Sequence, residues 1–558
     1  MKVTTKKAKQ IGFFAAVSML IGSVVGIGIF FKNNSIFKIN SFNEIGVIVS
    51  WIVAAFIAIA TAISFAIFGF SKKQGAGLSG SLEIFKYKKF ARFIAIAQPC
   101  FYNAALLPSL CFFGAEAFFK VILPPNETPP IWLLFVTTFI IFILFIVINL
   151  ISIKIAATLQ IISTILKFLP IIVFGIVGIV LGIKNWNYSL ASVAVNDQII
   201  TSSNAVYTKG NFSFTNILTA LPSILFAYDS FLNIGNIQHR IKNGSKRISW
   251  ILVFGIVCVA FFYLLLTIGQ IFVSEGTVFG VINKAWNYDA NIIKAVTLTV
   301  DVIILISILG VVNSFVLVDI NANQYLINQK IIFTSYWLSK IANNKNQYLK
   351  GAISSFISFS FFFIIHSIVG IIQNTDAYVD LMSNFSSVFF FLVYGLIIIC
   401  ALHNATKRNR YYKKYPFAKE LSLSNRNYSF SFFNKKEELL IRKQRISLPA
   451  KNFVDLQTKP WHYLVWTVAI VGCCFVFLYQ LFYGFTIQTW LDPYNKTMFG
   501  FGLYYDNNVT VSPWVASLIF FIFITIFIVT PFFNDSIIKL IHTKNQTLTK
   551  EIKTSLLV

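Results

Sequence analysis

The residues best suited to chemistry in this sequence are polar or glycine residues inside long apolar runs. Asp229 lies in the apolar run 216–237, between Pro222 and Gly235. A carboxylate near the middle of a membrane-spanning helix costs about 2.5 to 3.5 kcal/mol, so it should face protein or water rather than lipid. Because Pro and Gly both weaken a helix, we expect a backbone interruption near Asp229. Interrupted membrane helices expose backbone groups that bind the charged ends of small solutes.

A second such place is the run 11–31, in which Gly22, Gly26 and Gly28 fall within ten residues. A glycine in a helix interior is about 1 kcal/mol less favourable than alanine, so the cluster needs a physical reason. Two interpretations are open. Gly22 and Gly26 form a small-xxx-small pair for close helix packing, or the helix unwinds at Gly26–Gly28 and its free N–H groups bind an anionic group. A dinucleotide-binding fingerprint is excluded, because it requires a strand before the glycines.

Lys167 is the one basic residue inside the apolar runs. Leaving an ammonium without partners inside a membrane is costly. Lys167 is therefore expected either to exchange a proton during turnover or to bond carbonyl oxygens freed around Gly22 to Gly26. The residues themselves leave both roles open.

Membrane helices must position these residues. The chain has 558 residues, a mean hydropathy of +0.74 and only 12% charged residues, whereas a soluble domain averages about a quarter. This composition excludes an ordinary soluble enzyme. A membrane span takes about 20 apolar residues, and twelve apolar runs of suitable length occur at 11–31, 45–70, 93–119, 131–150, 155–183, 216–237, 249–273, 296–318, 351–372, 378–402, 462–486 and 513–533.

The distribution of basic residues predicts the orientation. Alternate connections on one side hold 37 of the 46 Lys and Arg residues, and those on the other side hold 8. By the positive-inside rule, both termini lie in the cytoplasm. This asymmetry accounts for most of the net charge of +26 and argues against a nucleic-acid partner. The segment 404–460 carries 14 Lys and Arg residues. We expect a cytoplasmic loop there that serves orientation, with binding of anionic lipid as the alternative.

Other chemistries find no support in the sequence. All six cysteines lie in apolar runs, namely Cys100, Cys111, Cys258, Cys400, Cys473 and Cys474. Neither a disulfide framework nor a zinc site is therefore predicted. His366 and His403 stand alone, and Asp301 and Asp319 lie toward opposite ends of one run. We therefore expect no metal, no cofactor and no enzyme activity.

Two interrupted helices five spans apart predict an inverted repeat with its site at the membrane midplane. The predicted fold is an all-α polytopic membrane protein with five-plus-five helices, of which helices 1 and 6 are broken, and two extra helices. The predicted divisions are a cytoplasmic N-terminus (1–10), the first repeat (11–183), an extracellular loop (184–215), the second repeat (216–403), the basic cytoplasmic loop (404–460), helices 11 and 12 (461–533) and a cytoplasmic C-terminus (534–558).

Four segments resemble motifs of the amino acid-polyamine-organocation (APC) superfamily of amino acid permeases. They are Gly22-Ser-Val-Val-Gly-Ile-Gly-Ile-Phe30, Phe226-Ala-Tyr-Asp-Ser-Phe231, Lys242-Asn-Gly-Ser-Lys-Arg-Ile-Ser249 and Ala157-Thr-Leu-Gln-Ile-Ile-Ser-Thr-Ile-Leu-Lys-Phe-Leu-Pro170. The resemblance covers residues 11 to about 330. Ser230 departs from a frequent glycine, Gln238-His239 replaces an acidic pair, and a basic residue is missing around Ile320 to Asn323. These departures put the salt bridges of the cytoplasmic gate in doubt.

The resemblance implies how an amino acid would bind. Its carboxylate would meet the N–H groups of Gly26 to Gly28, and its ammonium would meet carbonyls near Val24 and Phe226 to Tyr228. Phe226 would cover the substrate or simply pack, and Asp229 would brace the break in span 6 rather than bind substrate. Lys167 looks like a stand-in for the sodium ion of related transporters. The implied substrate-binding residues are Ser23, Val24, Gly26, Ile27, Gly28, Phe226, Ala227, Tyr228, Asp229 and Asn313.

The predicted function is secondary active transport of amino acids across the plasma membrane by alternating access, as proton-coupled symport or exchange. A polyamine or another organic cation is the alternative substrate, and a sodium-coupled symporter or a channel are further alternatives. The many Phe, Ile, Asn and Lys residues are typical of an A+T-rich genome and favour a bacterial source. Neither the particular amino acid nor the oligomeric state follows from these residues.

Overall fold

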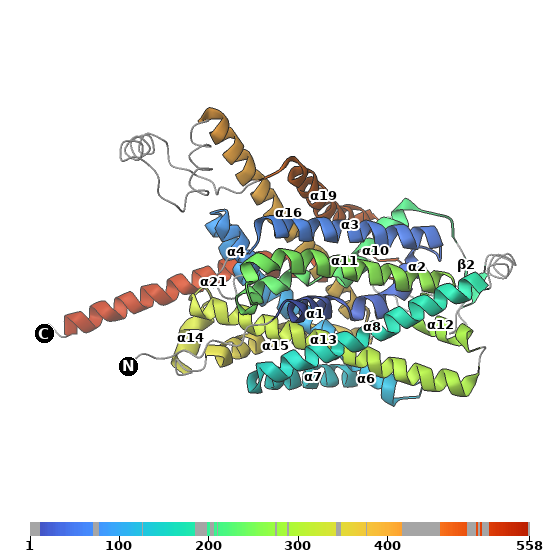
Figure 1. The fold of residues 1–558 in the computed structure, drawn as a ribbon. Coiled ribbons are helices and arrows are strands. Elements are labelled where there is room, and N and C mark those ends of the chain that lie inside the picture. Colours follow the sequence, from blue (N-terminus) through green and yellow to red (C-terminus); the bar gives the residue numbers. More distant parts are fainter. Residues whose placement is uncertain are drawn as a thin grey trace.

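The protein is a bundle of long helices that lie side by side, as the computed structural model in Figure 1 shows. The structure describes residues 12–70, 77–124, 127–184, 198–200, 206–208, 210–273, 276–286, 289–341, 347–374, 376–415, 458–487, 498–499, 503–504 and 513–555. Within these ranges, twelve helical segments are long and apolar enough to cross a membrane. The chain is therefore an all-α, multi-pass membrane protein, which confirms the fold class predicted from the apolar runs.

The spans follow the chain in order. The first five consist of α1 (Phe13–Val24) with η1 (Gly28–Lys32) and α2 (Asn33–Ile39), α3 (Glu44–Phe68), α5 (Lys88–Ala97) with η2 (Gln98–Asn103) and α6 (Ala104–Ile122), α7 (Ile131–Ile151), and α8 (Ile153–Lys184). The next five consist of α10 (Phe214–Tyr228) with η3 (Phe231–Arg240), α11 (Gly244–Ile271), α13 (Ala290–Asn328), α15 (Gln347–Gln373) and α16 (Ala377–Lys414). The last two are α19 (Pro460–Tyr479) with η4 (Gln480–Ile487), and α21 (Pro513–Ser555).

Short elements lie between the spans. They are α4 (Gly77–Ile84), α12 (Val278–Ala285), α14 (Thr334–Ile341) and two antiparallel strand pairs, β1 (Gln198–Ile200) with β2 (Val206–Thr208) and β3 (Met498–Phe499) with β4 (Leu503–Tyr504). In Figure 1, α4 and α14 lie at one end of the bundle, and α12 and β2 lie at the other. These elements therefore mark the two membrane faces. Most of the basic loop 404–460, namely 416–457, lies outside the described residues.

Several spans run longer than their apolar runs. The eighth was predicted at 296–318, but α13 covers Ala290–Asn328. It begins early because the Asp289 side chain accepts hydrogen bonds from the backbone N–H groups of Asn291 (3.1 Å) and Ile292 (3.3 Å). Such N-capping satisfies donors that have no partner within a helix. Hydropathy thus locates the apolar centre of a span, and capping groups decide where the helix begins.

Spans 1 and 6 are interrupted, as predicted. In span 1, α1 ends at Val24, and Val25 is extended (φ −74°, ψ 119°) before the π-helix η1 begins at Gly28. In span 6, α10 ends at Tyr228, Asp229 is extended (φ −65°, ψ 171°), and Ser230 is left-handed (φ 75°) before the 3-10 helix η3. The left-handed conformation explains why glycine suits the position of Ser230, since only glycine adopts it without steric cost.

The two broken helices pack in the centre of the bundle. The helix α1 contacts α8, α11 and α13, while α10 contacts α3 and α16. A second group of contacts joins α6, α7, α13 and α15. The helices α8 and α13 therefore connect the broken span 1 to the surrounding helices, and side chains on them can act on the break.

Candidate functional site

The two helix interruptions are joined by Tyr263 of α11. Its hydroxyl lies 3.2 Å from the carbonyl oxygen of Val24 and 3.1 Å from that of Ala227. Both carbonyls belong to the last turn of an interrupted helix, where C=O groups lack a partner within the helix. Because one hydroxyl reaches both, the fold brings the two breaks together. In this arrangement the Tyr263 hydroxyl occupies the carbonyls that were expected to bind the ammonium group of a substrate.

Lys167 of α8 binds two further carbonyls at the end of α1. Its side-chain nitrogen donates to the oxygens of Gly22 at 2.8 Å and Val25 at 2.6 Å, and the residue is fully buried. The Thr164 hydroxyl, one turn earlier, lies 2.7 Å from the carbonyl oxygen of Gln160 and 3.2 Å from that of Ser18. These are the contacts expected of a lysine that bonds the carbonyls of span 1.

Each glycine of span 1 allows close approach to a different helix. A Cβ atom at Gly22 would lie 2.1 Å from the Gln160 amide of α8, and one at Gly26 would lie 2.6 Å from Val311 Cγ2 of α13. A Cβ atom at Gly28 would lie 2.3 Å from the Cα atom of Ala227. The close-packing interpretation of the glycines therefore has direct structural support. The unwound turn of the other interpretation is present as well, so the two are not exclusive.

Asp229 is held by hydrogen bonds around the break in span 6. Its carboxylate accepts from the Tyr102 hydroxyl at 2.5 Å, from the Tyr394 hydroxyl at 3.3 Å and from the backbone N–H of Ser230 at 2.7 Å. Buried carboxylates need such donors to offset the loss of water. This arrangement supports the interpretation that Asp229 braces the break, because its oxygens are already engaged by protein groups.

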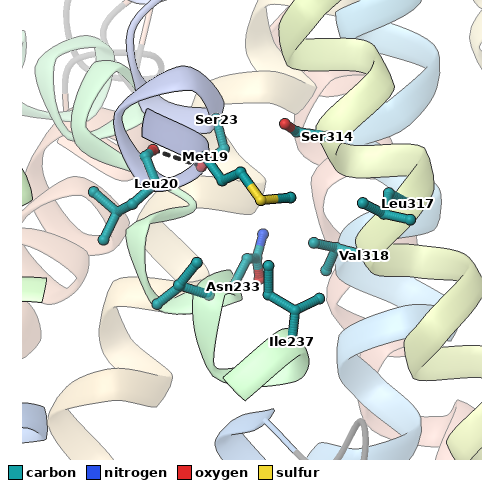
Figure 2. Close-up of a pocket in the computed structure, with 9 residues that line it drawn as sticks. Met19, Leu20, Ser23, Asn233, Ile237, Ser314, Leu317 and Val318 are labelled. Carbon is teal, nitrogen blue, oxygen red and sulfur yellow. Dashed lines mark hydrogen bonds between the residues drawn. The ribbon is translucent and has the colours of Figure 1, made fainter. Parts of the chain in front are cut away.

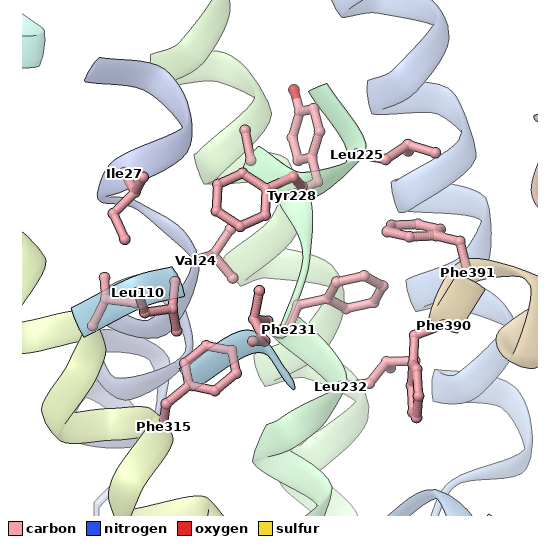
Figure 3. Close-up of a cluster of buried hydrophobic side chains, with 14 of the residues drawn as sticks. Val24, Ile27, Leu110, Leu225, Tyr228, Phe231, Leu232, Phe315, Phe390 and Phe391 are labelled. Atoms are coloured by element: carbon pink, nitrogen blue, oxygen red, sulfur yellow. The ribbon is translucent and has the colours of Figure 1, made fainter. Parts of the chain in front are cut away.

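The space between the breaks is filled by buried apolar side chains. Figure 3 shows Val24 and Ile27 from span 1, Tyr228 and Phe231 on either side of the break in span 6, and Phe315 from α13. The conformation is therefore closed at its centre. A bound solute would have to displace some of these side chains or be admitted by a movement of the broken helices.

Lys32, at the end of η1, covers this region on one side. Its buried ammonium lies 2.7 Å from Asp380 Oδ1 and 3.1 Å from Ser383 Oγ of α16. The same nitrogen lies 5.1 Å from the ring centroid of Phe226 and 5.3 Å from that of Phe113. Such distances allow cation–π attraction. An ion pair and two aromatic rings thus close the site on the side where η1 continues into α2.

Lys32 was not among the site residues predicted from the sequence. The predicted first span ended at 31, whereas the structure extends it over Phe13–Ile39 and buries Lys32 within it. Lys167 is therefore not the only basic residue inside a span. One signal was available: Lys32 follows Gly28 by one helical turn, which places it next to the predicted break.

A pocket lies on the opposite side of the breaks (Figure 2). It is a small, partly open pocket between α1, η3 and α13, and its lining includes Met19, Ser23 and Val318. The side-chain nitrogen of Asn233 and the hydroxyl of Ser314 also belong to it, and both lack a hydrogen-bond partner in the described structure. The pocket thus offers polar groups on the side of the membrane where α1 begins.

The remaining predicted site residues lie in different surroundings. Ser23 lines the pocket and donates to the carbonyl of Leu20 at 2.8 Å. Ala227 and Tyr228 are buried at the end of α10. Asn313 accepts a hydrogen bond at 3.0 Å from Asn149 of α7, so its side-chain oxygen joins two helices. Among the described residues, no group of three or more His, Cys, Asp or Glu side chains could hold a metal ion.

The fold is a membrane-spanning helical bundle with two broken helices that meet inside it. The chain belongs to the amino acid permease family, which it matches over residues 11–501.

Comparison with individual proteins agrees with this assignment. The chain is 24% identical over 337 residues to an uncharacterized protein of Mycoplasma pneumoniae and 25% identical over 327 residues to amino acid transporter protein 6 of Caenorhabditis elegans. These matches cover 55% and 57% of this chain, and 58% and 59% of the relatives. The fold resembles that of MhsT, solved in complex with L-phenylalanine, with a TM-score of 0.51 and 15% identity over 83% of this chain and 98% of that chain.

Proposed function

We propose that the protein carries amino acids across the plasma membrane by alternating access, as a proton-coupled symporter or an exchanger. The observation that carries this proposal is the meeting of the two helix breaks at Tyr263, which binds the carbonyls of Val24 and Ala227. Two opposed breaks offer both backbone N–H and backbone C=O groups in one place. A zwitterionic amino acid needs both kinds of partner.

The orientation of the substrate follows from the polarity of helix ends. The N-terminus of a helix carries a partial positive charge, so the substrate carboxylate would bind N–H groups at Gly26 to Gly28, where η1 begins. The substrate ammonium would take the place of the Tyr263 hydroxyl at Val24 and Ala227. Phe226, which lies next to the Lys32 ammonium, would cover the substrate from one side.

Alternating access requires that the site open to one face at a time. Lys32, Asp380 and Phe226 support a closed path on the η1 side, while the pocket at Ser23 and Asn233 supports a path toward the other face. We assign the pocket face to the cytoplasm, because the positive-inside rule places the N-terminal side of α1 there. A bacterial source and cytoplasmic termini belong to the same proposal.

Lys167 is proposed as the group that makes a sodium ion unnecessary. Its nitrogen lies at the carbonyls of Gly22 and Val25, which a cation would otherwise have to neutralise. A lysine there supplies the positive charge itself and can also release a proton. This favours proton coupling or exchange without an ion. The anionic-lipid interaction of 404–460 remains a proposal based on its basic residues.

Reconstitution into liposomes tests the function. We expect saturable uptake of a labelled amino acid that a subset of the twenty amino acids inhibits, and stimulation by an inward proton gradient or by unlabelled amino acid inside. Liposomes with the Gly28→Leu variant are the negative control. Inhibition by polyamines alone would identify an organic cation transporter instead. A strict sodium requirement, or flux that does not saturate, would contradict the proposed mechanism.

A further inference from the structure

Asp319 of α13 is a second buried carboxylate, and it lies outside the site described above. It is fully buried, and neutral side chains from three helices surround it. One carboxylate oxygen accepts from the Asn103 amide of η2 at 2.9 Å. The other accepts from the Ser355 hydroxyl of α15 at 2.5 Å and from the Asn323 amide of α13 at 3.2 Å. No step of the proposed transport cycle uses this group.

No cation in the described structure pairs with Asp319. Neither Lys350 of α15 nor Lys167 of α8 forms an ion pair with it, and the described pairs Lys32–Asp380 and Arg92–Asp535 involve other carboxylates. Cys100 of η2 is a titratable side chain near the carboxylate. A buried carboxylate that neutral donors bind but no cation pairs with is costly while it is charged, and it can take up a proton instead. Asp319 therefore has a physical reason to change its protonation state.

We propose that Asp319 is a proton-binding site that exchanges its proton with the medium during the transport cycle. In this step a proton from water adds to the carboxylate and forms a neutral carboxylic acid, and the reverse step returns the proton to water. The coupling part of this inference rests on the proposed transport function. The proton-binding part stands on the surroundings of Asp319 alone.

The surrounding side chains can accommodate both states. The Ser355 hydroxyl donates to the charged carboxylate, but a hydroxyl can also accept, so rotation about its C–O bond would let it accept from the protonated acid. The side-chain oxygen of Asn103 has no partner in the described structure, and rotation of this amide would provide a second acceptor. A metal cation fits less well, because three N–H or O–H donors point at the carboxylate.

Asp319 lies in the part of α13 that ends at one membrane face. It lies nine residues before the end of α13 at Asn328, which is about 13 Å at 1.5 Å per residue. Asn323 follows one turn later and accepts a hydrogen bond from Ser354 of α15 at 2.8 Å. These polar groups lead toward the face that we assign to the cytoplasm.

The π-helix η2 connects Asp319 to the broken span 6. Asn103 binds Asp319, and the preceding residue, Tyr102, binds Asp229 at the break. Gln98, at the start of the same π-helix, donates to Asn233 in η3 at 3.1 Å. Single π turns within helices often occur at functional sites. A change at Asp319 that shifts Asn103 would therefore also shift the adjacent Tyr102, which donates to Asp229 at the break in span 6.

Infrared difference spectroscopy on the substrate-free, full-length protein tests proton binding directly. Spectra recorded at several pH values should contain a C=O band of a protonated carboxylic acid that disappears in Asp319→Asn. The control, Asp301→Asn on the same helix, should retain this band. If Asp319→Asn does not fold, Ser355→Ala offers a second test, because loss of a donor to the charged form should move the appearance of the band to higher pH. A wild-type spectrum that neither variant changes would overturn the proposal.

Substrate binding tests the coupling separately. We expect the slope of log Kd against pH to decrease by about one in Asp319→Asn, which corresponds to one coupled proton fewer. The affinity at the optimal pH should change less than about threefold. A purely structural role would lower affinity and thermal stability without changing this slope. An unchanged slope would refute coupling at Asp319. If the wild-type protein binds no amino acid, the proposed function fails, and the infrared result still decides whether Asp319 binds a proton.

Discussion

The side-chain nitrogen of Lys167 lies 2.6 Å from the carbonyl oxygen of Val25, the residue at which span 1 leaves its helical conformation. Lys167→Gln keeps a donor at this position but removes the charge and the exchangeable proton. We expect this variant to lose accumulation driven by a pH gradient and to retain exchange of labelled for unlabelled substrate. Uptake and exchange in the same liposomes provide both measurements.

Lys167→Met separates bracing from proton exchange. It removes both hydrogen bonds, and each buried carbonyl left without a partner costs about 1 to 3 kcal/mol. We therefore expect lower thermal stability and weaker substrate affinity than in Lys167→Gln. Full gradient-driven uptake by Lys167→Gln would rule out proton exchange at this residue, and unchanged stability of Lys167→Met would rule out the brace.

Tyr263→Phe tests whether the substrate ammonium takes the place of the Tyr263 hydroxyl. Without substrate, the carbonyls of Val24 and Ala227 lose their donor, so the Tm should fall. A bound ammonium would restore their hydrogen bonds, so we expect the rise in Tm caused by substrate to be larger in the variant than in the wild type. The measurement is thermal unfolding with and without a saturating amino acid. An equal or smaller rise would place the ammonium elsewhere.

The packing at Gly26 leads to a test by double substitution. Gly26→Ala should lose most uptake, because its Cβ would lie 2.6 Å from Val311 Cγ2. Combination with Val311→Ala removes the clash and keeps the N–H at position 26, so uptake should return. If the double variant inserts normally but stays inactive, the substrate itself requires a glycine at this position.

Gly28 should behave differently from Gly26. A Cβ there would meet the backbone of Ala227 at 2.3 Å, and truncation of a side chain cannot relieve this contact. Gly28→Ala should therefore remain inactive together with Val311→Ala, which makes it the matched control for the double variant at position 26.

The ion pair of Lys32 and Asp380 should stabilise the closed conformation. Removal of one partner leaves a buried charge unpaired, which costs about 3 to 5 kcal/mol when the pair is fully buried. Because Asp380 is about 30% exposed, we expect a smaller loss for Asp380→Asn. Lys32→Met combined with Asp380→Asn should recover part of that loss. Thermal unfolding of Lys32→Met, Asp380→Asn and the double variant measures the coupling, and strictly additive effects would show that the two residues do not act together.

Much of the architecture follows from the sequence, because the membrane imposes simple rules. A span needs a long apolar run to avoid exposing polar groups to lipid, so twelve spans could be counted without knowing their neighbours. The breaks were also predictable, since Gly26 and Asp229 are unfavourable inside an apolar helix unless the backbone or a partner accommodates them. Lys167 was identified for the same energetic reason.

The partners of these residues were decided only by the tertiary structure. Tyr263 bonds carbonyls from spans 1 and 6, and Asn313 pairs with Asn149, yet nothing in the local sequence indicates either contact. Asp319 was considered only as a candidate for paired acids, and its surroundings of neutral donors come from helices far apart in the chain. Hydropathy and helix propensity act along the chain, whereas hydrogen bonds between buried side chains depend on how distant helices pack. The sequence therefore determined which residues need a partner, and the packing of the helices determined which partner each one has.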